Sequence, residues 1–303
     1  MLKMAVIRFI ALACLGFVAA SILATWLYGV FAARVQGEVS LALPAAGGQT
    51  QLDQKVGAVT DARPGESGLH LLDENLDAFA ARGLSARKAE RSLDLMYYIW
   101  HDDLTGRLLL AEALAAAERG VRVRILIDDI GTSHTWDAMI AMAHHPQIEI
   151  RIFNPTRARA NGLRRGIEMA LRAFSVTRRM HNKAWISDGR IAILGGRNIG
   201  DEYFDAAEHT NFRDMDVLAI GPVVAQTERI FDDYWNSGVA LPIDRLSPRR
   251  CAMRARPAAP SKPALPRANK GGQSCRTNFR TVQFRPQPQA VTRSRSCPSP
   301  ILR

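Results

Sequence analysis

The stretch MHNKAWISDGRIAILGGRN, residues 180–198, decides how the middle of the chain folds. Two short apolar runs, Ala184–Ser187 and Arg190–Leu194, flank the dipeptide Asp188-Gly189. Asp-Gly is a strong signal for the tight turn of a β-hairpin, because both residues tolerate a positive φ. The stretch therefore predicts two short antiparallel strands joined by a turn.

The same stretch carries reactive side chains in the pattern H-x-K-x4-D-x6-G-G-x-N. His181 and Lys183 are two residues apart, and side chains at i and i+2 of an extended backbone point to the same side. The hairpin then returns Gly195, Gly196 and Asn198, and glycines let the backbone approach a ligand closely. This set of groups suits a phosphoester: the cation and the amides hold the oxygens while a neutral imidazole nitrogen attacks phosphorus.

Each of these residues taken alone has a structural explanation. A single His beside an apolar strand is usually structural, and a single Lys is usually a solvated charge. Asp188-Gly189 is explained by its turn, and a glycine pair by another tight turn. Six specified positions at fixed spacing arise by chance in far fewer than one in ~10^4 chains, so the joint pattern favours a catalytic site.

Strand and helix patterns alternate on both sides of the hairpin. The expected elements are strand Ser92–Trp100, helix Leu104–Arg119, strand Val121–Ile127, helix Thr135–Ala143, strand Ile148–Phe153, strand Met215–Ile220 and a helix from Gly221-Pro222 to Asn236. Repeated βαβ units with hydrophobic strands predict an α/β sandwich around a largely buried sheet. Residues 69–246 are enough for one such domain.

With these motifs in place, the sequence resembles the phospholipase D superfamily, whose signature is a His-Lys-Asp motif followed by a Gly-Gly or Gly-Ser pair and an Asn. Four further stretches look like bacterial cardiolipin synthases, the C-type branch in particular: Tyr97–Asp103, Ala117–Asp129, Gly195–Phe204 and Phe212–Val217. The resemblance covers roughly residues 70–246. It implies a phospholipase D-like α-β-α sandwich around a mostly buried mixed sheet, in a single domain.

The resemblance also implies a two-step phosphatidyl transfer. His181 would attack the phospholipid phosphorus and expel its alcohol, leaving a phosphatidyl-histidine for a second alcohol; phosphatidylglycerol and phosphatidylethanolamine are the implied substrates. Lys183 and Asn198, with the glycine pair, would bind phosphate oxygens. Asp188 would support the site by orienting His181 or its neighbours, and neither a metal nor another cofactor is implied for this step.

Enzymes of this branch carry two such motifs, and the second His is expected to protonate the leaving group. A Lys two residues further on is missing after His101, His134, His144, His145 and His209. Either two chains pair to complete the site, as single-motif nucleases of the superfamily do, or the chain is a remnant whose second half is missing. Three hypotheses follow: a phosphatidyltransferase, a homodimeric nuclease, and an inactive membrane-binding product.

Charge argues against the nuclease. The formal net charge is +11, but 13 of the 40 basic residues lie in Ser247–Arg303, which contains no Asp or Glu. The first 246 residues therefore carry 27 basic and 29 acidic side chains. A globally basic surface for nucleic acid is not expected, because phosphate contacts require clustered cations.

The N-terminal run Phe9–Ala33 contains 25 residues without a charge. This is long enough to span a hydrocarbon core of ~30 Å. We expect residues 1–34 to form an uncleaved transmembrane anchor, in preference to a cleaved signal peptide or a buried helix. Lys3 and Arg8 predict a cytoplasmic N-terminus, which puts the catalytic domain on the periplasmic side of a bacterial inner membrane.

Residues 35–68 show no sustained period and are predicted to be a linker. Residues 247–303 hold nine of the fifteen prolines and eleven arginines. They are predicted to form a disordered basic tail, and the abrupt change of composition favours a frameshifted terminus over a binding arm. The four cysteines lie outside residues 69–246, so neither a disulfide framework nor a Cys-based zinc site is expected there.

Three acidic or basic features leave alternatives open. Asp128-Asp129 ends an expected strand, and a structural role is favoured over a metal site because adjacent strand residues diverge. Asp214 and Asp216 share a face and offer a weaker cation-binding alternative. The segment between Pro155 and Met180 has seven Arg and one Glu. It forms either a solvated helical face or a basic interfacial element that gathers anionic lipid.

Overall fold

An eight-stranded mixed sheet forms the centre of the computed structural model, which describes residues 2–45, 47–132, 135–159 and 161–246. The strand order is β1-β7-β6-β5-β2-β3-β4-β8. The strands are β1 Gly68–Leu72, β2 Ser92–Ile99, β3 Arg122–Gly131, β4 Ile148–Phe153, β5 Ala184–Ser187, β6 Ile191–Gly195, β7 Asp216–Ile220 and β8 Ala240–Pro242. Neighbours β2, β3 and β4 run parallel, and the other pairs of this sheet are antiparallel.

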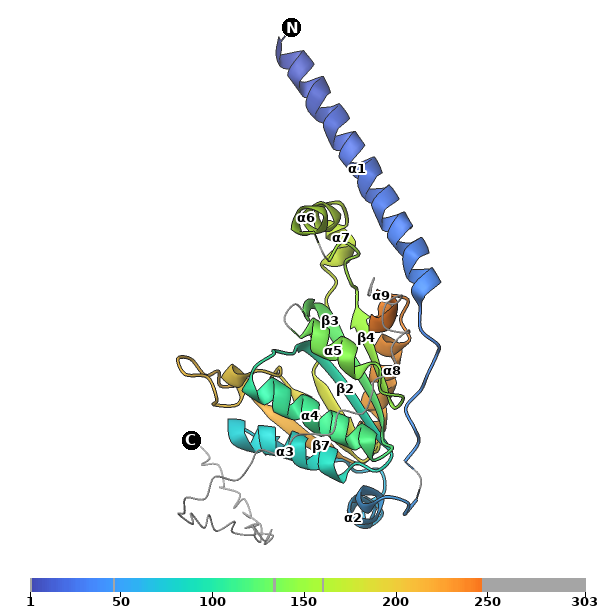
Figure 1. Cartoon of the computed structure of the whole chain (residues 1–303), viewed down its shortest axis with the longest axis vertical. Helices are drawn as coiled ribbons and strands as arrows, with labels where there is room; N and C mark the ends of the chain where they lie inside the picture. The colour runs from blue at the N-terminus through green and yellow to red at the C-terminus, as the bar shows by residue number, and fades with distance from the viewer. Residues whose placement is uncertain (1, 46, 133–134, 160, 247–303) are drawn as a thin grey trace, which may run out of the picture. The chain divides into compact units, whose positions relative to one another are not determined.

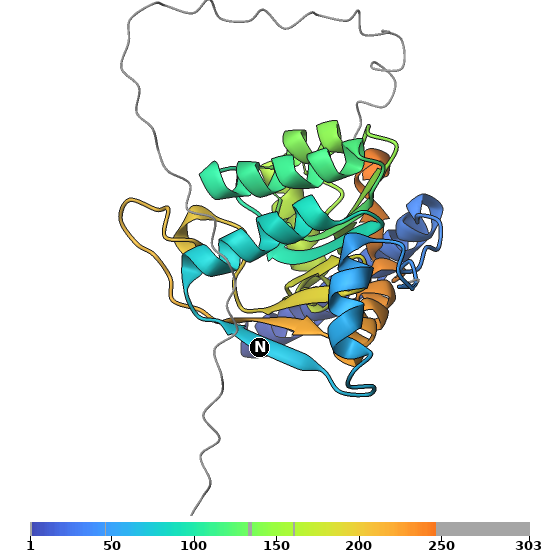
Figure 2. The same cartoon turned by 90° about the horizontal axis from the view of Figure 1, so that it is seen from below.

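Helices cover both faces of this sheet (Figures 1 and 2). The helices α3 Asn75–Lys88, α4 Leu104–Glu118 and α5 Trp136–Met142 pack on one face, and α8 Pro222–Trp235 packs on the other. Because successive strand side chains point to opposite faces, Leu95 lies in the first core and Met96 in the second. The predicted α-β-α sandwich around a mixed sheet is confirmed.

The N-terminal helix α1 (Leu2–Val35) is apolar over most of its length. Residues Lys3–Val35 form a helix long and apolar enough to cross a membrane, with a mean hydropathy of 2.4 in a window that is not buried at all. The last turns of α1 are in contact with the domain: Tyr28 and Ala32 are buried against Leu241 of β8. The C-terminal end of the candidate anchor is therefore fastened to the domain, while the predicted tail 247–303 lies outside the described residues.

Residues 35–68, predicted to be a linker, are fastened to the domain by side chains from distant parts of the sequence. The short helix α2 (Gln51–Thr60) begins with a capping box between Thr50 and Asp53. The buried Asp53 carboxylate pairs with Arg91 and Arg190. Further upstream, Ser40 Oγ accepts a hydrogen bond of 2.8 Å from the indole of Trp235. These contacts join parts of residues 35–68 to the domain, which the lack of local periodicity did not indicate.

The β5–β6 hairpin turns at Asp188 and Gly189, whose φ angles are 54° and 65°. This is the turn that the Asp-Gly dipeptide predicts. The carboxylate of Asp188 is fully buried and accepts hydrogen bonds from the backbone N–H groups of Glu90, Arg91 and Ser92, at 2.8–3.1 Å. Asp188 therefore fixes the place where the chain enters β2.

Charged side chains are buried beside this turn, between the sheet and α8. Arg124 makes a two-pronged ion pair with Asp94 at 2.7 and 2.8 Å, and it also contacts Asp232 at 2.9 Å. Glu228 lies next to Gly189, and its Oε1 has no hydrogen-bond partner in the described structure. Burial, together with the negative charges of Asp94 and Asp232, raises the pKa of Glu228 to about 7.

Replacing Asp188 tests its role as an anchor of β2. Asp188→Ala should lower the free energy of unfolding by about 2–3 kcal/mol, because buried N–H groups lose their acceptor and alanine disfavours a positive φ. Asp188→Asn keeps one acceptor oxygen and tolerates this φ, so it should cost clearly less. Chemical denaturation of the two variants measures the difference; equal losses would contradict the anchoring role.

Glu228 makes stability depend on pH with a defined sign. Its pKa in the folded state, about 7, lies above the ordinary value of 4.5. The stabilisation from its proton is therefore complete below about 4.5 and is lost as the pH rises through about 7. Glu228→Gln should leave the melting temperature unchanged near pH 4.5 and raise stability at pH 8 by on the order of 1 kcal/mol. Thermal melts of both proteins across this pH range test the prediction. A Glu228→Gln variant that is less stable than the unaltered chain at pH 8 would refute it.

Candidate active site

His181 and Lys183 lie immediately before β5, at the edge of the sheet where the parallel strands end. Because Ala184 pairs with Met96 in antiparallel register, the residues before β5 run beside the carboxyl end of β2. The carboxyl ends of parallel strands are where open α/β sheets bind their ligands. We call this edge the active edge.

The structure brings the two predicted residues together. Lys183 Nζ lies 3.1 Å from Nδ1 and 3.4 Å from Nε2 of His181, and it donates to the His181 carbonyl at 2.7 Å. His181 is exposed, whereas only 6% of Lys183 is accessible. Burial lowers the pKa of Lys183, and the charge of nearby Asp214 opposes that shift. A protonated lysine has only donors, so an unprotonated ring nitrogen of His181 can accept a hydrogen bond from it.

Tyr98 completes the surroundings of the imidazole, and the sequence patterns had not singled it out. Its ring centre is 4.9 Å from that of His181, and Lys183 Nζ lies 5.5 Å from the Tyr98 ring centre. The side chain of the neighbouring Tyr97 lies in the core on the opposite face of the sheet and is not part of the active edge. The alternation of side chains along a strand predicts that Tyr97 and Tyr98 point to opposite faces. It places Tyr98 beside His181 only when the pairing of β5 with β2 is known.

Asp128, at the end of β3, holds the backbone that leads into His181. Its carboxylate accepts a hydrogen bond of 3.1 Å from Met180 N and pairs with Arg179 at 3.2 Å. Burial raises the pKa of Asp128, although Arg179 and the backbone donors counteract it. Asp129 points elsewhere and accepts from Thr156 at 3.1 Å. These contacts agree with the structural role expected for the acidic pair.

The glycine pair serves the close approach of two strands. A Cβ at Gly195 would collide with the Asp216 carboxylate, and one at Gly196 would collide with Asp214. The N–H of Gly196 already donates to the carbonyl of Met215, at 3.2 Å. In this structure the partner of this amide, which was expected to hold a phosphate oxygen, is therefore the β6–β7 connection.

Asn198 and Asp188 also make contacts other than the expected ones. Asn198 is 4% exposed; its Oδ1 accepts from Ile99 N at 3.1 Å and its Nδ2 donates to the Tyr203 hydroxyl at 2.9 Å. Asp188 lies at the far end of β5 from His181, bonded to residues 90–92. Within the described residues Asp188 therefore holds the start of β2, and Asn198 holds its end.

Two sets of side chains that include carboxylates are candidates for binding a metal. Asp216 is fully buried and pairs with Arg82 at 2.8 Å and Arg197 at 3.5 Å, so its charge is neutralised by protein cations, which argues against the weaker cation-binding alternative.

Among the described residues, the ligand atoms of His101, Asp103 and Glu202 lie within 4.8 Å of one another. Asp103, however, accepts from Gly106 N and Asp201 N at 2.9 and 2.8 Å, as the cap of α4. This structural role accounts for the cluster.

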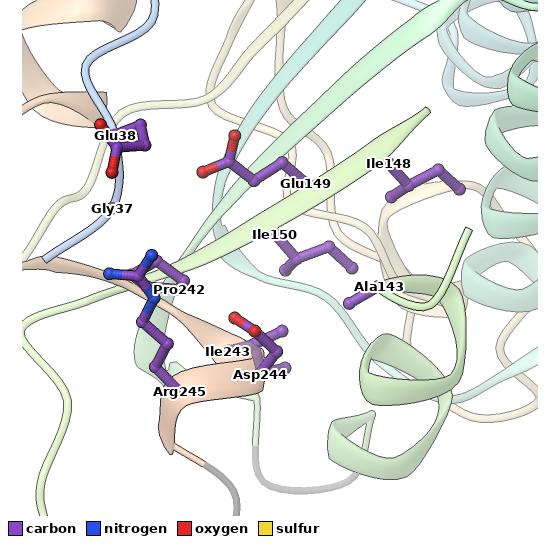
Figure 3. Close-up of a pocket in the computed structure, with 10 residues that line it drawn as sticks. All are labelled: Gly37, Glu38, Ala143, Ile148, Glu149, Ile150, Pro242, Ile243, Asp244 and Arg245. Atoms are coloured by element: carbon purple, nitrogen blue, oxygen red, sulfur yellow. The ribbon is translucent and has the colours of Figure 1, made fainter. Parts of the chain in front are cut away.

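A cavity of about 280 Å³ lies away from the active edge (Figure 3). Its lining includes Gly37, Ile148 and Arg245. Ile148 begins β4, whereas the active edge lies where β4 ends. The cavity contains none of the motif residues and is not assigned to the chemistry.

Comparison with known proteins identifies the domain. Residues 85–235 match the family model described as "Cardiolipin synthase, PLD-like domain". Cardiolipin synthase C of Escherichia coli K12 is 47% identical over 183 residues, covering 60% of this chain and 38% of the relative. Cardiolipin synthase A of Pseudomonas syringae pv. syringae is 31% identical over 166 residues, covering 54% and 32%. The solved structure of Nuc, a phospholipase D family member from Salmonella typhimurium, shows a TM-score of 0.42 and 18% identity, covering 58% of this chain and 98% of that one.

The chain spans less than two fifths of the length of these two synthases. The family match nevertheless includes every strand from β2 to β7, and with them His181 and Asn198. The resemblance drawn from the motifs is confirmed. The chain belongs to the phospholipase D superfamily, through a PLD-like domain of the cardiolipin synthase type.

Proposed function

We propose that the chain is a phospholipase D-type phosphatidyltransferase that uses His181 as its nucleophile. The observation that carries the proposal is the exposed imidazole with the Lys183 ammonium 3.1 Å from Nδ1, at the active edge. The relatives named cardiolipin synthase support phospholipids as the substrate class. Phosphatidylglycerol and phosphatidylethanolamine are the proposed substrates.

In the proposed reaction, a ring nitrogen of His181 attacks the phosphorus of the phospholipid phosphodiester. The bond from phosphorus to the headgroup oxygen breaks, and the departing alcohol takes up a proton. The phosphatidyl group remains on His181 until the hydroxyl of a second phosphatidylglycerol attacks, loses its proton and releases the imidazole. Water in place of this alcohol gives phosphatidic acid. Throughout, the Lys183 cation stabilises the charged phosphoryl oxygens.

The surroundings of His181 suit a nucleophile that must be held in place. Tyr98 packs against its ring, and Asp128 holds the preceding residue, Met180. Such support matters because small displacements of a reacting group cost large factors in rate. The proposal therefore gives Tyr98 and Asp128 positioning roles.

The departing alcohol needs an acid, and His181 is the one histidine of the 303 residues followed by Lys at the second position. We propose that two copies of the chain pair with their active edges facing, so that the partner supplies the second imidazole. We also propose that α1 anchors the domain on the periplasmic side of the inner membrane, since Lys3 and Arg8 precede its apolar run.

Product formation tests the proposal. The full chain, in mixed micelles of phosphatidylglycerol and phosphatidylethanolamine, should yield cardiolipin or phosphatidic acid. His181→Ala should abolish turnover and the acid-labile phosphatidyl adduct, and Lys183→Met should slow turnover about 10^2–10^3-fold, as expected for loss of a charge-stabilising group.

His70→Ala, at an exposed histidine on β1, is the matched control and should retain activity. No lipid product from the unaltered chain would refute the transferase. Cleavage of single-stranded DNA without lipid turnover would favour the nuclease in its place.

A further inference from the structure

A short helical excursion between β4 and β5 carries an apolar stripe that the domain does not cover. It consists of α6 (Gly162–Leu171) and α7 (Ala173–Val176), and α6 has no buried residue. Leu163, Ile167 and Phe174 are 76%, 53% and 90% exposed. Exposed apolar groups gathered on one element usually mark a surface that meets a partner or a membrane.

The stripe has a fixed direction because the polar side of α6 is bonded to neighbouring protein groups. The carboxylate of Glu168 accepts from Arg157 N and Ala158 N, at 2.9–3.0 Å, and pairs with Arg172 at 2.7 Å. Arg165 reaches Asp129 of β3, at 3.6 Å. Leu163 and Ile167 are four residues apart and lie on one face of α6, and the exposed Phe174 follows on α7, beyond the break at Arg172. That face cannot turn inward without breaking these bonds.

The last third of α1 lies beside this excursion. A cleft of about 450 Å³ separates α6 from Ala24, Leu27 and Tyr28 of α1. Two guanidinium groups tie the elements together: Arg157 lies 4.6 Å from the Phe31 ring centre, and Arg172 lies 3.3 Å from that of Tyr28. In Figure 1, α1 runs down the picture and α6 is seen close to end on, so the helices cross.

The length of α1 places this crossing at a membrane surface. A hydrocarbon core of ~30 Å takes up about 20 helical residues. Counted from Phe9, the first residue after the charged Lys3 and Arg8, such a span ends near Tyr28. The cleft to α6 begins at Ala24, so α6 crosses α1 where the helix leaves the membrane.

The charges of the excursion match an anionic surface. Of the seven arginines between Pro155 and Met180, Arg157, Arg164 and Arg178 are exposed and have no ion pair within the described residues. Exposed cations beside an apolar stripe are typical of helices that lie in the plane of a membrane. Cations close to an anionic lipid surface are attracted to it.

We propose that α6, α7 and their flanking arginines form an in-plane membrane-docking element. Leu163, Ile167 and Phe174 enter the boundary of the acyl chains beside α1, and the exposed arginines bind the phosphates of anionic phospholipids. The proposal decides between the two alternatives that the sequence left open for residues 155–180. It does not rest on the chemistry of His181, and its test requires no turnover.

Hydrogen exchange of the full chain provides the test. The chain is compared in detergent, in nanodiscs of phosphatidylcholine alone, and in nanodiscs that also contain phosphatidylglycerol. Peptides covering residues 162–177 should exchange about fivefold more slowly in the phosphatidylglycerol nanodiscs than in detergent. Peptides of β2 and β3 should be unchanged, which reports that the domain remains folded.

Two sets of variants separate the apolar and the ionic contributions. The triple variant Leu163→Asp, Ile167→Asp, Phe174→Asp should lose the protection, whereas Leu84→Asp, at a similarly exposed leucine of α3, should keep it. Replacing Arg157, Arg164 and Arg178 with Gln should remove the difference between the two nanodisc compositions. Equal exchange in detergent and both nanodiscs would overturn the docking element, and equal protection without phosphatidylglycerol would overturn the assignment to anionic lipid.

Discussion

The active edge depends on β2 being held at both of its ends by residues of one hairpin. Asp188 binds the N–H groups at the start of β2, and Asn198 binds Ile99 at its end. This explains the spacing of the motif in physical terms. The four residues between Lys183 and Asp188 are the strand β5, and those between Asp188 and the glycine pair are the turn and β6. His181 is exposed and Lys183 is buried beside it, whereas Asp188 and Asn198 bind the two ends of β2.

Buried charge fixes the rest of the frame. Arg82 and Arg197 are both fully buried and share the carboxylate of Asp216, which connects α3, the β6–β7 connection and the start of β7. Arg197 also donates to the carbonyl of Leu72, at the end of β1. An unpaired charge in such a place costs several kcal/mol, so any shift of these elements that breaks a pair is strongly opposed. Pairing of this kind selects one arrangement over others of similar apolar burial.

Local patterns predicted the elements whose signals are local. The strand Ile148–Phe153 was predicted with the bounds of β4, and Gly221-Pro222 marked the start of α8. By contrast α3 escaped prediction, because its buried face includes the charged Arg82, whose partner lies far along the chain.

The candidate site, like the fold, has features that local patterns predict and features that depend on distant parts of the chain. The i, i+2 rule predicted that His181 and Lys183 meet, whereas the closeness of Tyr98 to His181 can be predicted only when the order of the strands is known. The four-residue strand β5 separates Asp188 from Lys183 by five residue steps, or about 16 Å, so any support that Asp188 gives His181 is indirect.

The end of β3 links the active edge to the proposed docking element. Asp128 and Asp129 are consecutive, so they reach different neighbours: Asp128 binds Arg179 and Met180, and Asp129 binds Thr156 and Arg159. The excursion through α6 and α7 therefore leaves and rejoins the domain at one strand end. Because both ends of the excursion are fixed at this strand end, a lipid surface that binds the excursion would also set the distance between His181 and the lipid phosphates. The proposed docking element and the proposed nucleophile are thus both held by consecutive residues of β3.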